Sequence, residues 1–245
     1  MSTQPIYQAV LRIMQRRMSF QEPVTLLDVG AGNGALLAHI TAQHPVIANA
    51  CDYYPEFFTM PAVPVQKVDL NREPLPYPDA SFQVVTCSEV IEHLENYRAL
   101  LREMHRVLKP GGLLIVTTPN ILNVKSRLRF FGSGFYNLFG PLPVRNDQLY
   151  STGHHITPIS FFHLSHALLD VGFSSIQDAT DRVQKYSLVW LLFLAPLLGL
   201  GWLFFMHQEQ RVYKTLTAEN EPLVRRHNRF ALLTGRTLLV SAIKP

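Results

Sequence analysis

The chain has 245 residues, of which 47% are hydrophobic and 16% are charged, and its formal net charge is +4 at pH 7. This length and apolar content allow a single domain, residues 1–245, with a full core, and the lack of tandem repeats or low-complexity tracts excludes a repeat protein. The modest positive charge suits a nucleic acid or an anionic membrane, but no RNA-binding signature accompanies it, so no nucleic-acid partner is expected.

The first predicted element is a helix between Ile6 and Met18, where apolar residues recur at helical spacing. Arginines at positions 12, 16 and 17 interrupt it, so it lacks the uninterrupted apolar core of a secretory signal. The two cysteines, Cys51 and Cys87, are expected to be free thiols at strand ends. We therefore expect the domain to face the cytoplasm.

A glycine-rich turn follows the next predicted strand, residues 25–29. Three glycines at alternate positions, Gly30, Gly32 and Gly34, lead into a predicted helix from residue 35 to 40. Glycines at such a turn permit backbone angles closed to other residues and let a ligand approach the main chain. The spacing differs from the G-x-G-x-x-G of pyrophosphate loops, and Asp28 before the turn suits a cationic or amino-bearing ligand better than a phosphate.

This turn resembles the first motif of the class I S-adenosylmethionine (SAM)-dependent methyltransferases, whose loop wraps the aminocarboxypropyl end of the cofactor. The alternative is an unrelated glycine turn in another α/β protein. The resemblance implies SAM as cofactor and contacts to it from Asp28, Gly30, Gly32, Asn33 and Gly34.

Two further predicted strands end in acids. The strand over residues 46–51 ends at Asp52, which lies 18 residues past Gly34 and so near the interval at which α/β nucleotide sites place a ribose-binding acid. Tyr53 follows it and is included in the cofactor site. A short strand over residues 63–68 precedes Asp69 and Leu70. By the resemblance, Asp69 meets the adenine amino group and Leu70 packs on the ring.

Residues 82–88 form a mostly apolar run typical of a buried parallel strand, and the resemblance places cofactor contacts at its end, at Cys87 and Ser88. A helix over residues 96–108 should stop at 109–112, before a strand over 113–120. Residues 20–120 resemble ubiquinone-biosynthesis methyltransferases (methyltransferase type 11). The expected fold is an α/β, Rossmann-like seven-stranded sheet, with residues 173–179 and 232–243 as the final strand pair and the last strand antiparallel.

Glu89, Glu92 and His93 stand at i, i+3 and i+4, so a helical turn would place them on one face beside the cofactor. The pattern resembles the one that binds a divalent ion in ubiquinone-pathway O-methyltransferases and in small-RNA 2′-O-methyltransferases. The resemblance implies Mg²⁺ or Mn²⁺, with His154 or His155 as a further ligand. Alternatively, His93 acts as a catalytic base or has a structural role.

Residues 121–150 interleave basic and aromatic side chains after the fifth predicted strand. We expect a lid over the acceptor or a second membrane contact, and a surface loop is the alternative. The cations are Lys125, Arg127, Arg129 and Arg145.

Residues 186–208 are almost entirely apolar, and no Asp, Glu, Lys or Arg lies between Lys185 and Glu209. The length suits a membrane-spanning helix, but a single crossing would separate the last strand from its sheet. Because Pro196 falls mid-segment, we expect two short helical halves that enter one leaflet at the inner face of the cell membrane. The flanking cations Arg182, Lys185, Arg211 and Lys214 would meet lipid phosphates. An internal helix pair or a dimer interface is the alternative, and the oligomeric state stays open.

The expected function is therefore SAM-dependent O-methylation of a lipophilic or lipid-linked small molecule, such as a quinone precursor, by a peripheral or monotopic membrane protein. The rival interpretations are a soluble dimeric small-molecule methyltransferase and a membrane scaffold that binds SAM without catalysis. An RNA methyltransferase would predict salt-sensitive nucleic-acid binding.

Overall fold

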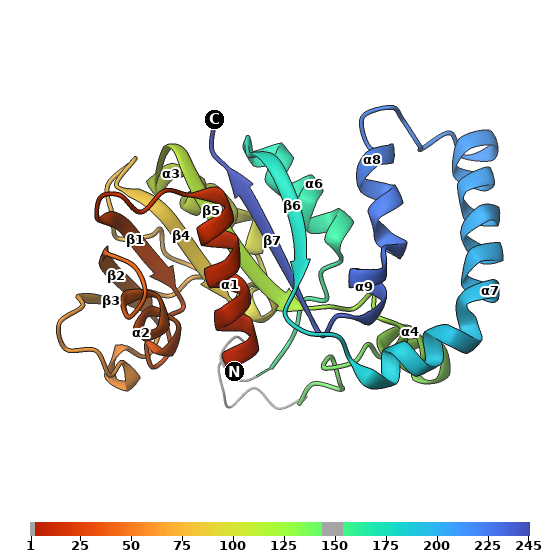
Figure 1. The fold of residues 1–245 in the computed structure, drawn as a ribbon, viewed down its shortest axis with the longest axis horizontal. Helices are drawn as coiled ribbons and strands as arrows, with labels where there is room; N and C mark the ends of the chain where they lie inside the picture. Colours follow the sequence, from red (N-terminus) through yellow and green to blue (C-terminus); the bar gives the residue numbers. More distant parts are fainter. Residues whose placement is uncertain (1–2, 144–153) are drawn as a thin grey trace.

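The computed structural model describes residues 3–143 and 154–245. Its centre is a seven-stranded sheet in the order β3-β2-β1-β4-β5-β7-β6 (Figure 1). The strands are β1 (Val24–Val29), β2 (Val46–Asp52), β3 (Val65–Lys67), β4 (Phe82–Ser88), β5 (Leu108–Pro119), β6 (Ser174–Thr180) and β7 (Thr237–Ile243). The helices of three turns or more are α1 (Gln4–Arg17), α3 (Tyr97–Val107), α6 (Phe161–Val171) and α7 (Lys185–His207). Shorter ones are α2 (Ala35–Thr41), α4 (Val124–Ser133), α8 (Glu221–Val224) and α9 (Phe230–Thr234).

The sheet confirms the predicted Rossmann-like class. Strands β1 to β5 pair in parallel, whereas β7 pairs antiparallel with both β5 and β6. The last strand is shorter than expected, because residues 230–234 form α9 before β7 begins at Thr237. The carboxyl ends of the five parallel strands meet at one edge, where open α/β sheets bind ligands.

Helices cover both faces of the sheet, and each face has its own apolar cluster. Helix α1 lies in front of the sheet, and α3 and α6 lie behind it (Figure 1). The front cluster joins Ile6 and Met14 to Leu37, and the rear cluster joins Met104 to Phe161. Because both faces are covered, β4 is buried at every position except Gln83, which explains its nearly continuous apolar sequence.

Residues 184–234 leave the sheet after β6 and return to it before β7. Val183 and Gly235 form an antiparallel bridge, and the Gln184 amide donates to the Thr234 carbonyl oxygen at 2.8 Å. The prediction of two helical halves was wrong, because a single helix, α7, runs through Pro196 and continues into the π-helix Gln208–Val212. Proline removes only one backbone hydrogen bond, so the helix bends and stays continuous. Figure 1 shows the change of direction along α7.

The predicted insertion at residues 121–150 forms α4 in its first part. Asn123 caps this helix, since its side-chain oxygen accepts from the Ser126 amide at 2.9 Å. Helix α4 packs against α7. Arg145 lies outside the described residues, so the role of 121–150 as a lid stays a prediction.

Candidate functional site

A cavity of about 670 Å³ lies at the carboxyl edge of the sheet, bordered by residues that follow β1, β2, β3 and β4. Most of the predicted cofactor and catalytic residues line it together, although they come from four separate stretches of the sequence. They are Gly30, Gly32, Asn33, Asp52, Tyr53, Asp69, Leu70, Ser88, Glu89 and His93.

The glycine loop forms one wall of this cavity. Gly30 has a φ of +71°, and a Cβ there would lie 2.4 Å from Cγ2 of Val90, so both conformation and space require glycine. Gly32 has a φ of +55°, and a Cβ there would meet nothing within 4 Å. The backbone at Gly32 is therefore open to the close approach of a ligand. Gly34 instead faces Phe58 and begins α2, so it shapes the loop from behind.

Asp52 ties the end of β2 to the glycine loop. Its Oδ2 atom accepts a hydrogen bond from the Gly32 amide at 2.8 Å, and its Oδ1 atom accepts from the Tyr54 amide at 2.8 Å. A carboxylate has about four acceptor sites, so sites remain for a ligand's hydroxyls.

Asp69 has a similar arrangement after β3. Its Oδ1 atom accepts from the Asn71 amide at 3.0 Å, and the Asp69 amide donates to Oε2 of Glu73 at 2.8 Å. These bonds hold the backbone so that Asp69, Leu70 and Asn71 all border the cavity.

Asp28 lies behind the wall and does not border the cavity. It is buried in β1, and its Oδ1 atom accepts from the Thr86 hydroxyl at 2.7 Å. Burial raises the pKa of Asp28 to about 7, the Thr86 bond opposes the rise, and the nearby carboxylate of Asp52 adds to it. Asp28 can therefore influence a ligand in the cavity through its charge, but it does not touch that ligand directly.

Cys87 is also set back from the cavity. It is fully buried in β4, and burial raises the pKa of its thiol well above the ordinary value, so the sulfur is neutral. The next residue, Ser88, does line the cavity. Of this predicted pair, Ser88 is thus the one that can touch a ligand.

The acid and histidine residues after β4 do not share one helical face as predicted. Glu89 adopts a left-handed backbone with a φ of +58°, and only Ile91–His93 forms a short 3₁₀ turn. The cluster that could hold an ion consists of Glu92, His93 and His155, whose ligand atoms lie within 4.8 Å of one another. Glu89 is therefore not part of the candidate ion-binding cluster, although its carboxylate still lies close enough to Glu92 to affect its pKa.

Glu92 is fully buried, and among the described residues neither of its carboxylate oxygens has a hydrogen-bond partner. Burial and the Glu89 carboxylate raise the pKa of Glu92 well above its ordinary value. An unpartnered buried carboxyl is unfavourable unless a bound group uses it. The backbone around it is fixed, because its carbonyl oxygen accepts from the amides of Ile156 and Thr157 at 2.8 and 3.0 Å.

The two imidazoles of the cluster are neutral at pH 7. Burial lowers the pKa of His93, and burial together with His93 lowers the pKa of His155 to about 4. The rings pack edge to face with centroids 4.8 Å apart. Neutral imidazoles can accept a proton or coordinate a metal ion.

Glu89 lines the cavity beside this cluster. Its Oε1 atom accepts from the Thr117 hydroxyl at 3.1 Å. Burial raises the pKa of Glu89 to about 7, and the Thr117 bond opposes the rise. A carboxyl with this pKa can exchange a proton at neutral pH.

Sequence reasoning missed several residues that line the cavity. Tyr7 comes from α1, which precedes the first motif, and only the packing of α1 on the sheet brings it there. Tyr54 and Phe57 follow Asp52 and also line the cavity, with their rings 5.8 Å apart. Aromatic residues directly after a strand that ends in an acid could have predicted this part of the lining. Of the two histidines proposed as a further metal ligand, His155 lines the cavity. The backbone carbonyl oxygen of His154 instead accepts a hydrogen bond from His93.

Comparison with known proteins agrees with this geometry. Residues 27–116 match the family model of a methyltransferase domain. The chain is 50% identical over 89 residues to a probable S-adenosylmethionine-dependent methyltransferase of Mycolicibacterium smegmatis, covering 35% of this chain and 26% of that protein. The crystal structure of a SAM-dependent methyltransferase from Archaeoglobus fulgidus has the same fold, with a TM-score of 0.60, 16% identity and coverage of 99% and 95% of the two chains. Residues 27–116 therefore form a methyltransferase domain, and the chain has the fold of a SAM-dependent methyltransferase.

The chain is also 32% identical over 90 residues to the demethylmenaquinone methyltransferase of Geobacillus stearothermophilus, covering 36% of this chain and 38% of that protein. The match to each of these two curated relatives spans well under half of the relative's length. The family model ends at residue 116, so α4 and α7 lie beyond the matched domain.

Proposed function

We propose that the chain transfers the methyl group of SAM to the hydroxyl oxygen of a small lipophilic acceptor. The observation that carries this proposal is one cavity bordered by the glycine loop, by Asp52 and Asp69, and by the acid and histidine residues after β4. In this proposal the first three bind the cofactor's amino-acid tail, ribose and adenine, and the last group contacts the acceptor.

The reaction needs the methyl carbon and the acceptor oxygen held in line. The oxygen forms a bond to the methyl carbon while the bond from carbon to the sulfonium sulfur breaks, and that electron pair stays on sulfur to give S-adenosylhomocysteine. The acceptor's proton leaves to a base. Glu89 is the base in this proposal, because it lines the cavity and its pKa of about 7 suits proton transfer at neutral pH.

We further propose that Glu92, His93 and His155 hold a divalent ion. The unpartnered carboxyl of Glu92 and two neutral imidazoles fit such an ion. One carboxylate and two imidazoles suit Mn²⁺ better than Mg²⁺, which prefers oxygen ligands, so the expectation of Mg²⁺ finds no support in this donor set. When bound, the ion would lower the pKa of an acceptor hydroxyl. If chelation with EDTA leaves the activity unchanged, the ion is excluded and Glu89 accepts the proton without it.

A lipophilic acceptor is favoured by the apolar residues among the cavity walls, which include Phe57, Leu70, Val90 and Leu94. The name of the Geobacillus relative supports a quinone precursor as the acceptor class. Because substrate specificity depends on the site and not on the fold, the acceptor needs direct identification.

The deciding experiment combines SAM titration by calorimetry with incubation of the full chain, methyl-labelled SAM and a bacterial lipid extract. The expected result is SAM binding, S-adenosylhomocysteine formation and a labelled lipophilic product whose new bond is to oxygen by mass spectrometry and NMR. SAM binding without S-adenosylhomocysteine would instead identify a non-catalytic scaffold. Absence of SAM binding would overturn the cofactor assignment, and a labelled carbon would overturn the acceptor atom.

A further inference from the structure

Helix α7 exposes large apolar side chains around most of its circumference, and only the narrow face through Leu191, Leu194, Leu198 and Trp202 is half-buried. The consecutive residues Leu192 and Phe193 are each 73% exposed, and Leu203 and Phe204, three turns later, are 68% and 65% exposed. In the most apolar window of this helix no residue is buried within the molecule. A dimer contact or a core contact uses one apolar stripe of a helix, whereas α7 exposes apolar side chains well beyond one stripe, and hydrocarbon can cover such a broad surface.

Helix α4 extends this apolar surface. Phe131 on α4 is 92% exposed, and α4 packs against α7. The junction includes a hydrogen bond from the Lys125 amide to the Ser187 hydroxyl at 3.4 Å. We call α4 and α7 together the α4–α7 surface.

The connections of α7 prevent it from crossing a bilayer, although its length and composition would allow a crossing. The Val183–Gly235 bridge fixes the start and the end of this excursion beside each other. Residues 208–229, which lead back, are rich in charge, and Arg226 and Arg229 both pair with Asp178 of β6 at 3.3 Å. A charged returning segment anchored to the sheet cannot pass through hydrocarbon, so α7 must enter and leave a membrane on one side.

Cations border the apolar stretch of α7 at both ends. Arg182 and Lys185 precede it, and Arg211 and Lys214 follow it, whereas no charged residue lies between Lys185 and Glu209. Basic residues beside an apolar helix complement anionic lipid headgroups. This charge pattern favours a bilayer over a second copy of the chain, because two copies would bring the same cations together.

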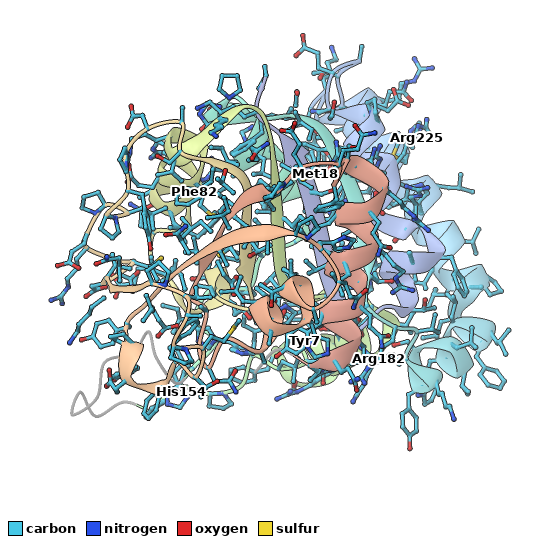
Figure 2. The ribbon with its side chains drawn as sticks, turned by 60° about the vertical axis from the view of Figure 1, so that its left-hand side comes forward. Tyr7, Met18, Phe82, His154, Arg182 and Arg225 are labelled. Atoms are coloured by element: carbon cyan, nitrogen blue, oxygen red, sulfur yellow. The ribbon has the colours of Figure 1, made fainter. Side chains whose placement is uncertain are left out.

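The α4–α7 surface begins at the edge of the sheet that carries the cavity, and α7 then runs along the side of the molecule away from that edge (Figure 1). Helix α4 follows the carboxyl end of β5, and α7 follows the carboxyl end of β6. Figure 2 shows Arg182, which precedes α7, at the same lower end of the molecule as Tyr7 of the cavity wall and His154. A membrane bound at this surface would place its lipids near the acceptor site.

We propose that the α4–α7 surface inserts into one leaflet of a membrane that contains anionic lipid, with the cavity edge turned toward that membrane. Helix α7 buries its apolar side chains among the acyl chains, Phe131 adds a second contact, and the flanking cations meet headgroup phosphates. This inference does not depend on catalysis, so it stands or falls separately from the methyl-transfer proposal.

To test this proposal, the full chain is synthesised in a cell-free extract that contains vesicles of phosphatidylcholine and phosphatidylglycerol. Flotation then measures the fraction of the chain bound to the vesicles. The wild-type chain is expected to float with the vesicles. The double variant Leu192→Asp/Phe193→Asp should bind at least about tenfold more weakly, because charge is unfavourable in hydrocarbon. The matched control Ile47→Asp/Leu169→Asp changes two exposed apolar residues, on β2 and α6, that lie outside the α4–α7 surface, and it should float like the wild type. Unchanged SAM affinity would show that each variant is folded.

A labelling experiment tests the one-sided insertion. Both natural cysteines are buried, and Glu219 is an exposed residue between α7 and α8, so Glu219→Cys adds one accessible thiol. A membrane-impermeant maleimide should label it fully on intact vesicles. Protection until detergent is added would show a crossing and overturn the proposal. A wild-type chain that stays unbound to vesicles and forms a dimer, which Leu192→Asp/Phe193→Asp converts to a monomer, would show a protein interface instead.

Discussion

The Nδ1 atom of His93 lies 2.8 Å from the backbone carbonyl oxygen of His154, and the two form a hydrogen bond. Because a carbonyl oxygen only accepts, Nδ1 carries the proton and Nε2 of the neutral ring keeps its lone pair. Metal-binding histidines are commonly oriented by such a bond. The segment that supplies this carbonyl also supplies His155, so one stretch of chain both orients one ligand and provides another.

The first prediction concerns Glu92→Gln. This variant should lower Mn²⁺ affinity by at least about a hundredfold, since even outer partners of metal ligands contribute roughly 10–100-fold. Without metal its stability should equal or exceed that of the wild type. The raised pKa means that the folded protein keeps a proton on Glu92 that the unfolded chain releases above about pH 4.5, which lowers the free energy of unfolding as pH rises. Gln removes this loss.

Electron paramagnetic resonance of free Mn²⁺ measures the binding, and thermal unfolding measures the stability. Glu95→Gln, at an exposed neighbouring position, is the control and should change neither. A wild-type chain that binds no stoichiometric Mn²⁺ would contradict the metal site.

The second prediction concerns Asp52→Asn. The amide keeps one acceptor oxygen for the loop but loses the charge that strengthens hydrogen bonds to ribose hydroxyls. The dissociation constant for SAM should rise about 10–100-fold, corresponding to one or two charge-assisted hydrogen bonds. Calorimetry measures it, with the exposed Asp170→Asn as the control. An affinity equal to that of the wild type would remove Asp52 from the cofactor site.

The third prediction concerns the pH dependence of SAM binding. Without ligand, Asp28 has a pKa of about 7, so it is mostly protonated at pH 6 and mostly ionised at pH 8. SAM carries a positive charge on its sulfonium and on its amino group, so it should bind the ionised form better. Its affinity should therefore rise up to about tenfold from pH 6 to pH 8 with release of a proton. Asp28→Asn should abolish this slope. Glu89→Gln tests the other cavity group with a pKa of about 7, and loss of the slope in that variant alone would assign the effect to Glu89.

The fourth prediction concerns Gly30→Ala. A left-handed backbone costs a non-glycine residue about 1–2 kcal/mol, and the new methyl overlaps Val90 at additional cost. The variant should unfold at lower temperature and bind SAM weakly. In the Val90→Ala background, Gly30→Ala should cost less stability, because the overlap with Val90 is removed. The cost of the left-handed φ at residue 30 should remain. If Gly30→Ala lowers the free energy of unfolding by the same amount in the wild-type and in the Val90→Ala background, the overlap relaxes freely.

The parts of the fold set by local sequence could be predicted well. Strand β4 agrees with the predicted residues, and α3 ends at Val107 before the predicted stop. These elements have strong patterns and clear end signals. The prediction of two helical halves at Pro196 was wrong, because a proline can bend a helix without ending it when the neighbouring turns keep their hydrogen bonds.

The site was predicted only where a residue follows a strand directly. Asp52 and Asp69 line the cavity because strand order alone brings their positions to one edge. The prediction that Glu89 shares a helical face with Glu92 and His93 was wrong, because Glu89 has a left-handed backbone. That conformation depends on packing after β4, which residue spacing does not encode. Tyr7 depends on how α1 packs on the sheet, which no local pattern encodes.

The Val183–Gly235 bridge has a consequence for how this architecture varies. Because the chain departs from and rejoins the sheet at neighbouring positions, the excursion between them can lengthen, shorten or change composition while β6 and β7 keep their register. If α7 attaches the protein to a membrane as proposed, membrane attachment and the cavity are encoded in separable stretches of the chain. A single insertion or deletion between Val183 and Gly235 would then add or remove the attachment while the sheet and the cavity stay intact.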